Sequence, residues 1–168
     1  FGQVLVKVLV SGICGSQLQE IAGNKGNAKF MPHLMGHEGA GIVEEVGEGV
    51  TTVKVGDKVV MHWRPSDGIE AEFPEYIFNG KKISSGRVTT FSEYAIVSEN
   101  RVTAVPDDTP NELCVLLGCS LSTAFGAVNA EARVQPGEAV LIIGAGGLGA
   151  SLIKAAKLAK ASRQRNRR

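Results

Sequence analysis

Apolar residues in the first two thirds of the chain recur in short runs that alternate with polar residues and are separated by glycine-rich turns. A period of two, together with many β-branched residues, favours strands over helices. We therefore expect strands over residues 3–10, 42–46, 58–62, 89–97 and 101–105, with one short helix over residues 17–22. Many short strands at such close spacing predict a small β-barrel or sandwich.

The period of the apolar pattern changes after residue 105. Thr109 to Glu112 has the form of a capping box with Pro110 at the first helical position, which predicts the start of a helix. A second helix is expected over residues 123–132. Residues 139–143 are all apolar, which is typical of a strand buried on both faces of a parallel sheet. A further helix should run from Ala150 to about Ala161.

Gly144, Gly146 and Gly149 have the spacing G-x-G-x-x-G between that strand and that helix. In a nucleotide-binding loop the first glycine makes the turn, the second lets the backbone approach a pyrophosphate, and the third brings the helix close to the strand. The same spacing also occurs in a turn without a ligand. An acidic residue should follow about 20 positions on to hold the ribose, and only the arginine-rich residues 163–168 stand there. We therefore expect the chain to be a fragment with an incomplete nucleotide-binding domain.

The composition is that of an ordinary globular protein, because 43% of the 168 residues are hydrophobic, 21% are charged and the formal net charge is +1. Such a balance favours neither a nucleic-acid partner nor a membrane partner. Three cysteines are an odd and sparse set, which indicates a reducing compartment and hence the cytoplasm. We interpret the arginines at the end of the chain as a solvated tail or a cloning scar, although four arginines can also bind nucleic acid.

A histidine and a carboxylate, His37 and Glu38, lie in a glycine-rich stretch that we expect to form a tight bend, and Cys14 and Cys119 lie in glycine-flanked turns. Two thiolates and an imidazole suit Zn²⁺ and leave its fourth position open, as a catalytic zinc site requires. The spacing is not that of a local metal-binding clip, and a single cysteine is more often a small buried apolar residue. Cys114 should be such a core residue, because it lies within a helical pattern.

Four motifs occur in the same order as in one known family. Residues 36–41, followed by Gly47 and Val50, resemble the signature of zinc-containing alcohol dehydrogenases of the medium-chain dehydrogenase/reductase superfamily. Residues 11–16 and 117–123 are similar to that family's first and third zinc-ligand turns, and residues 144–149 to its coenzyme loop. The resemblance therefore extends over essentially the whole chain.

The resemblance implies a β-rich, GroES-like barrel with a helical connection over residues 1–134, followed by the first β-α unit of an incomplete Rossmann domain over residues 135–168. By position it implies a catalytic zinc held by Cys14, His37 and Cys119. Glu38 would lie beside the metal, and Ser16 would accept the proton of the substrate hydroxyl.

The resemblance also implies a nicotinamide coenzyme, NAD or NADP. Thr123 would lie near the nicotinamide. The coenzyme-binding residues expected in the loop are Gly144, Gly146, Gly147 and Gly149.

The chain departs from the family pattern in two regions. Residues 63–86 contain no cysteine, so we expect one catalytic zinc and no structural zinc, with this segment held by packing of its aromatic residues Trp63, Phe73, Tyr76 and Phe78. Gln19 stands where some members have a histidine that relays protons. Gln17 stands where an aspartate commonly orients the zinc-binding histidine, and an amide can still accept a hydrogen bond there but carries no charge.

The function implied is that of a zinc-dependent oxidoreductase that transfers a hydride between an alcohol and NAD(P), the product being an aldehyde or ketone. We expect the 168-residue chain alone to be inactive, and the parent protein to be a homodimer or homotetramer. Two alternatives stay open. The protein can be a zinc-free member like the superfamily's quinone reductases, or a non-catalytic zinc-binding or interaction module whose basic tail contacts acidic partners.

Overall fold

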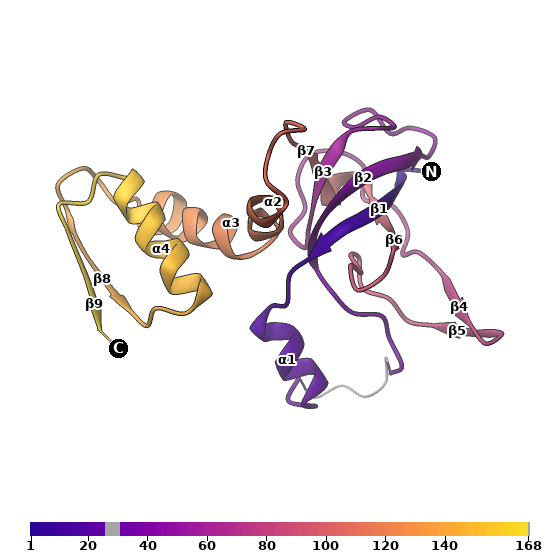
Figure 1. The fold of residues 1–168 in the computed structure, drawn as a ribbon, viewed down its shortest axis with the longest axis horizontal. Helices are drawn as coiled ribbons and strands as arrows, with labels where there is room; N and C mark the ends of the chain where they lie inside the picture. Colours follow the sequence, from indigo (N-terminus) through magenta and orange to yellow (C-terminus); the bar gives the residue numbers. More distant parts are fainter. Residues whose placement is uncertain (26–30, 168) are drawn as a thin grey trace. The chain divides into compact units, whose positions relative to one another are not determined.

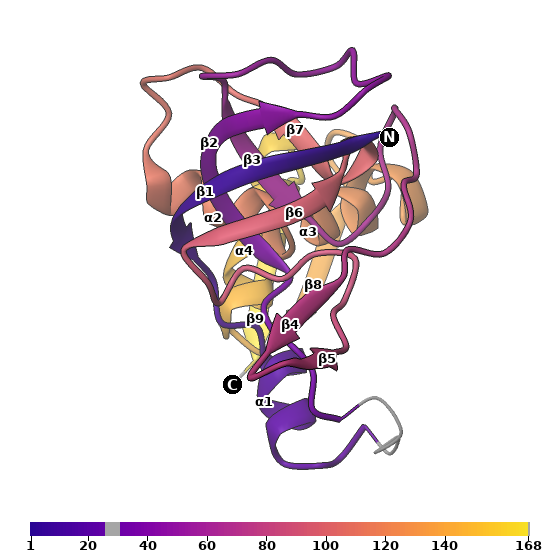
Figure 2. The same ribbon diagram turned by 90° about the vertical axis from the view of Figure 1, so that its right-hand side faces the viewer.

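The computed structural model describes residues 1–25 and 31–167, with the backbone alone for residues 163–167. These residues form two compact units, residues 1–118 and 119–168, which are described separately (Figures 1 and 2). The sequence-based domain boundary after residue 134 stays a prediction.

An antiparallel sheet of five strands forms the first unit, in the order β6-β1-β2-β3-β7 (Figure 2). The strands are β1 (Gln3–Ser11), β2 (Glu38–Val46), β3 (Lys58–His62), β6 (Tyr94–Ser98) and β7 (Val102–Ala104). Alternate residues point to opposite faces of a strand. Val4, Val6 and Val97 accordingly lie in one buried cluster together with Val59 and Met61.

The five expected strands are present, but only β3 has the predicted limits. β6 begins at Tyr94 and not at residue 89, because Thr89 and Thr90 are buried outside the ladder. Thr90 Oγ1 donates a hydrogen bond to the Glu38 carbonyl at 3.1 Å. A buried hydroxyl needs such a partner. Thr90 therefore supports the start of β2, whereas Thr89 Oγ1 lies 3.3 Å from the Tyr76 hydroxyl.

The glycine-rich stretch 36–41 is a bend only at its first residue, where Gly36 has φ +94°. From Glu38 onward it is strand β2, so the expectation of a bend throughout was wrong. The later glycines have a different reason. A Cβ atom on Gly41 would lie 2.3 Å from the Lys7 carbonyl oxygen, so only glycine lets β1 and β2 approach this closely.

Two short helices accompany the sheet. Helix α1 (Gly15–Ile21) follows β1, and α2 (Asn111–Leu117) covers the face of the sheet opposite the main core, where Cys114 packs on Ala40 and Val60. Cys114 is thus the core residue that was predicted. The predicted capping box is wrong, because Pro110 is itself the extended cap residue and no side chain caps the helix.

Residues 63–86 are held by polar contacts and not by aromatic packing, which corrects the sequence-based expectation. Trp63, Phe73 and Phe78 are 44%, 50% and 65% exposed. Tyr76 is the first residue and Phe78 the last residue of strand β4 (Tyr76–Phe78), which pairs with β5 (Lys81–Ile83). The segment is attached to the barrel by Glu70, whose two carboxylate oxygens each lie 3.1 Å from Nη2 of the buried Arg101.

A buried carboxylate ties three loops of this unit together. Glu99, 1% exposed, lies in a short 3₁₀ turn (Glu99–Arg101). Its Oε1 accepts hydrogen bonds from the backbone N–H groups of Thr51 and Thr52 at 2.6 and 2.8 Å, and its Oε2 accepts one from Ile69 at 2.8 Å. Burial alone raises a carboxyl pKa, but these donors outweigh it and lower the pKa of Glu99 to about 2.

The second unit is an α/β segment. Helix α3 (Ser120–Phe125) continues as a π-helical segment (Gly126–Glu131), and strand β8 (Ala139–Ile143) leads to helix α4 (Gly147–Leu158). The two helical segments pack through Ala124, Val128 and Ala155. Strand β9 (Arg163–Arg167) pairs with β8 in parallel, as a parallel sheet requires.

Four features of the second unit differ from the sequence-based expectations. The helix expected over residues 123–132 begins at Ser120 and is π-helical from Gly126. Strand β8 has the predicted limits, but it is not buried on both faces, since Leu141 and Ile143 are 59% and 80% exposed. Helix α4 begins at Gly147, inside the glycine loop, and ends at Leu158. Strand β9 was not predicted, because its arginine, glutamine and asparagine residues lack a strand pattern.

Among residues 1–25 and 31–167 no single helix is long and apolar enough to cross a membrane. Asn111–Leu117 and Ser120–Glu131 meet the requirement only when taken together as a bent pair.

We predict that Glu99 makes folding of the first unit sensitive to acid. Its folded pKa of about 2 lies below its unfolded value of about 4.3. Its stabilisation is therefore complete above about pH 5 and is lost as the pH falls toward 2. Glu99→Gln should lower the free energy of unfolding at pH 7 by about 2 kcal/mol, and this difference should shrink toward pH 3.

Urea unfolding followed by Trp63 fluorescence at pH 7, 5 and 3 measures this difference. Glu44→Gln, at an exposed position of β2, removes the same charge without a buried hydrogen-bond network and should leave the curves almost unchanged. A Glu99→Gln variant whose deficit is the same at pH 3 as at pH 7 would contradict the prediction.

Candidate metal centre

The first predicted ligand, Cys14, lies at the start of α1. It is the cap residue of that helix, with φ −82° and ψ 147°, and its carbonyl accepts the Gln17 N–H at 2.9 Å. The turn before it packs against β2. The Gly12 N–H donates to the Glu38 carbonyl at 3.1 Å, and a Cβ atom on Gly12 would lie 2.7 Å from Glu38 Cδ. The missing side chain at Gly12 therefore allows Cys14 to come close to the start of β2.

The second predicted ligand, His37, directly precedes β2. Its Nδ1 lies 3.1 Å from Gln17 Nε2, whereas its Nε2 is buried and has no hydrogen-bond partner among residues 1–25 and 31–167. Burial is the main cause that lowers the pKa of His37; the positive charge of Lys25 lowers it further and Glu20 opposes this. The ring is therefore neutral at pH 7, which is the state that binds metals.

The third predicted ligand, Cys119, is joined directly to Gly118, the residue that ends α2. Gly118 lies against the strands, because a Cβ atom on it would be 2.6 Å from the Met61 carbonyl oxygen and 2.8 Å from Glu38 Cβ. Its backbone can approach β2 and β3 only because it carries no side chain. Cys119 is the next residue, so the packing of Gly118 constrains the position of the Cys119 backbone.

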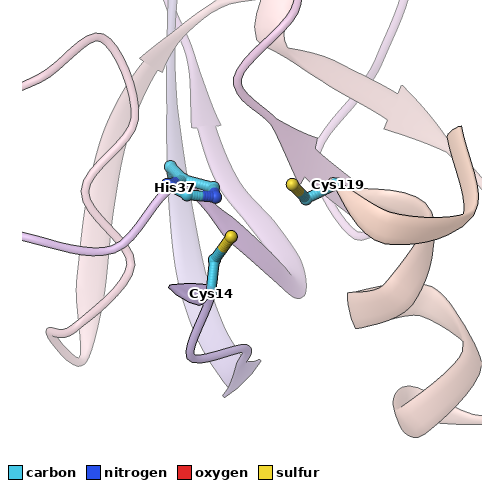
Figure 3. Close-up of side chains that lie close together, drawn as sticks. All are labelled: Cys14, His37 and Cys119. Atoms are coloured by element: carbon cyan, nitrogen blue, oxygen red, sulfur yellow. The ribbon is translucent and has the colours of Figure 1, made fainter. Parts of the chain in front are cut away.

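The ligand atoms of Cys14, His37 and Cys119 all lie within 4.8 Å of one another, and the three side chains point toward one another (Figure 3). The structure therefore brings together three residues from distant parts of the sequence. Two sulfur atoms and one imidazole nitrogen form a donor set that zinc prefers, and three protein ligands are typical of catalytic zinc sites.

Glu38 lies next to this group without being part of it. Its side chain is 6% exposed and lies between the backbones at Gly12 and Gly118. Burial raises the pKa of its carboxyl group. The role of Glu38 beside the metal stays a prediction.

Ser16 lies in the first turn of α1 and borders an open cleft of about 490 Å³ in the first unit. His37, Trp63 and Phe73 also line this cleft. Lys25 Nζ donates a hydrogen bond to Ser16 Oγ.

Sequence reasoning did not find three charged or titratable residues that line this cleft, Glu20, Lys25 and His33. His33 Nε2 lies 3.0 Å from Glu20 Oε1. No periodic or motif signal marks these residues, because Glu20 and His33 are distant in the sequence and their contact is a tertiary one.

In the second unit, the glycines of the predicted coenzyme loop have different structural reasons. Gly144 has φ +93°, and a Cβ atom on Gly149 would lie 2.2 Å from the Gly144 carbonyl oxygen. A Cβ atom on Gly146 or Gly147 would meet open space. Thr123 lies in α3, where its N–H donates to the Cys119 carbonyl at 3.0 Å. The coenzyme-binding roles of these five residues stay predictions.

Comparison with known proteins agrees with this architecture. The alcohol dehydrogenase GroES-like domain family matches residues 1–107. The chain is 38% identical to alcohol dehydrogenase 6 of Peromyscus maniculatus, covering 96% of this chain and 49% of that protein. It is 35% identical to an S-(hydroxymethyl)glutathione dehydrogenase of Escherichia coli O1:K1 / APEC, covering 96% and 50%. The chain thus spans about half the length of the curated relatives it matches.

A solved structure is similar over the same part. The crystal structure of benzyl alcohol dehydrogenase from Acinetobacter calcoaceticus matches 99% of this chain and 51% of its own, with a TM-score of 0.83 and 30% identity. These matches confirm the predicted fold class, a GroES-like β-rich domain followed by the start of a Rossmann unit.

We predict that Glu38→Gln stabilises the protein at pH 7 when a chelator keeps it free of metal. Burial raises the folded pKa of Glu38 above its unfolded value, so ionisation is harder in the folded state. The penalty is absent below the unfolded pKa and grows as the pH rises through the folded pKa. The free energy of unfolding of the variant minus that of the wild type should therefore increase between pH 4 and pH 7.

The free energy of unfolding in urea, measured at both pH values, tests this expectation, with Glu44→Gln as the exposed control on the same strand. A Glu38→Gln variant that is less stable than the wild type at pH 7 would contradict it.

Proposed function

We propose a function from one premise: the chain belongs to the alcohol dehydrogenase GroES-like domain family. The proposed function is that of a zinc-dependent oxidoreductase that transfers a hydride between an alcohol and NAD or NADP, giving an aldehyde or ketone. The observation that carries this proposal is the convergence of Cys14, His37 and Cys119.

The residues present fit a zinc ion. His37 Nε2 is buried without a partner, and an unsatisfied buried polar group costs about 1–3 kcal/mol. A metal at this nitrogen removes that cost, and the two cysteine thiolates supply charge and soft sulfur ligands. A zinc ion held by Cys14, His37 and Cys119 would supply Lewis-acid polarisation of an alcohol oxygen and so lower the pKa of the hydroxyl.

The remaining roles fall to residues that border the cleft. Ser16 Oγ takes the hydroxyl proton of the substrate, and the serine releases its own hydroxyl proton to solvent in the open cleft. The hydrogen bond from Lys25 holds the Ser16 side chain at the cleft. Glu38 supports the metal ligands from the strand side. Trp63 and Phe73 offer apolar surface to the organic part of a small alcohol or carbonyl compound.

The coenzyme assignment is supported by Gly146, one of the two loop glycines that the fold does not explain. Gly144 and Gly149 are needed by the turn and by the close approach of helix and strand. Gly146 has φ −67° and open space around its position, so another residue would fit the folded chain. A pyrophosphate that contacts the backbone at this point is the remaining reason for a glycine.

The same proposal extends to the whole protein. The 168 residues span about half the length of the relatives. We expect a cytoplasmic homodimer or homotetramer with one catalytic zinc per subunit and no structural zinc, acting on small molecules and not on nucleic acid or membranes. That the 168 residues alone do not turn over substrate stays a prediction. The basic side chains of residues 163–168 lie outside the described part.

The test of the proposed metal site is the zinc content of two cysteine variants. Protein purified without chelator should hold about one zinc per chain, and Cys119→Ala should reduce this to near zero because a three-ligand site loses a thiolate. Cys114→Ala, five residues earlier in the core, should keep the zinc and lower the free energy of unfolding by roughly 1 kcal/mol.

Elemental analysis and urea unfolding of both variants are the measurements. Wild-type protein with almost no zinc would favour the zinc-free quinone-reductase alternative. A protein that binds zinc through these ligands, but whose full-length form oxidises no alcohol, would favour the non-catalytic module.

Two glycine variants test the coenzyme loop. Gly146→Ala should fold with nearly unchanged stability but bind NAD(P) at least tenfold more weakly in the full-length protein, because a methyl group blocks the backbone. Gly149→Ala should destabilise the second unit, because its Cβ atom would clash with the Gly144 carbonyl oxygen at 2.2 Å. Calorimetric titration with NAD⁺ and NADP⁺ and thermal unfolding separate the two effects. Undiminished coenzyme binding by Gly146→Ala would refute the loop assignment.

A further inference from the structure

Gln17 is the one described residue of α1 that is buried, and it lies directly against the proposed zinc ligand His37. Its side-chain amide has one acceptor oxygen and two donor hydrogens, which are not interchangeable. The neighbours of this amide therefore decide which end faces the histidine.

The Gly36 backbone N–H decides it, because that group can only donate a hydrogen bond. It lies 2.7 Å from Gln17 Oε1. With the oxygen fixed there, Nε2 of Gln17 faces His37 Nδ1 at 3.1 Å and Glu20 Oε2 at 3.4 Å. The reverse orientation would place the NH₂ group against the Gly36 N–H and the oxygen against the Glu20 carboxylate, two unfavourable contacts.

This orientation also decides where the imidazole carries its proton. Since Gln17 Nε2 donates, His37 Nδ1 must accept, and a neutral ring then has its single proton on Nε2. Nε2 is the nitrogen that is buried without a partner, and it is the one left to face the cysteines, because Nδ1 is engaged by Gln17. In the metal-free protein this nitrogen therefore carries a hydrogen where a metal needs a lone pair.

We propose that Gln17 is a positioning residue that holds His37 in the tautomer opposed to zinc binding, and so weakens the affinity of the site for zinc. A metal-bound histidine normally donates its other ring N–H to an acceptor, which is the reverse of the bond seen here. To bind zinc, the proton must leave Nε2 and Nδ1 must gain one, and the Gln17 amide must turn round. The Gly36 N–H then loses its acceptor.

The tautomer part of this inference depends on the described contacts alone, whereas its zinc consequence rests on the proposed function. The two parts are tested separately. If the proposed zinc site is wrong, neither the wild type nor any variant binds zinc at this site. The tautomer of His37 in the metal-free protein still tests whether Gln17 donates to Nδ1.

The tautomer is read from ¹⁵N–¹H NMR spectra of the imidazole rings in the metal-free protein. The chain has three histidines, so the His37 signals are identified by their loss in His37→Gln. We expect the wild type to carry the proton on Nε2. A proton on Nδ1 in the metal-free wild type would overturn the inference, and this measurement needs no variant at Gln17.

The affinity is tested with Gln17→Glu, which keeps the shape of the side chain. One carboxylate oxygen can accept the Gly36 N–H while the other accepts a proton on His37 Nδ1, so these two neighbours are satisfied in the metal-binding tautomer. The second oxygen also faces Glu20 Oε2, which loses the donor that Gln17 Nε2 offers at 3.4 Å. Outer partners of a ligating histidine typically change metal affinity 10–100-fold. Gln17→Glu should therefore bind Zn²⁺ about 10–100-fold more tightly in chelator competition, and its metal-free His37 should carry the proton on Nδ1.

The matched control is Gln19→Glu, which adds the same charge to the same helix at an exposed side chain whose amide contacts Asn24 at 2.8 Å. It should leave both the tautomer and the zinc affinity close to those of the wild type. Equal tightening by the two variants would assign the effect to charge and overturn the role of Gln17. Unchanged zinc affinity in Gln17→Glu would overturn it as well.

Discussion

The close approach of two backbone turns to Glu38 is the constraint on which the candidate metal centre depends. Gly12 lies against the Glu38 side chain from the end of β1, and Gly118 lies against it from the end of α2. Each proposed ligand is a near neighbour of these contacts, since Cys14 follows Gly12 by two residues, Cys119 follows Gly118, and the remaining ligand precedes Glu38 itself. A side chain at either glycine would push a ligand away, because backbone and carboxylate leave no space.

Two buried carboxyl groups have opposite electrostatic behaviour in the same unit. Glu99 accepts three backbone N–H groups, so its charge is stabilised and it serves as a permanent anchor for loops. Glu38 is buried without such a set of backbone donors to its carboxylate, and its pKa rises. Burial is common to both, and the number of donors decides the sign.

The direction of one hydrogen bond connects the scaffold to the proposed chemistry. Gln17 satisfies the Gly36 N–H at the left-handed turn before β2, and the same amide then donates to His37. The scaffold requirement and the metal requirement thus compete for one side chain. The family fold and the ligand set are compatible with zinc, yet the metal-free protein holds its histidine in a state that must change before zinc binds.

The sequence by itself determined the strand pattern, the limits of β3 and β8, the core position of Cys114 and the order of the motifs that name the candidate ligands. These follow from local periodicity and spacing, which depend on neighbouring residues alone. Only the tertiary structure decided that the three ligand atoms converge, that polar contacts of Glu70 hold residues 63–86, and that Gln17 donates to His37. Hydrogen-bond polarity and close backbone approach depend on groups that are distant in sequence, and no local pattern encodes them.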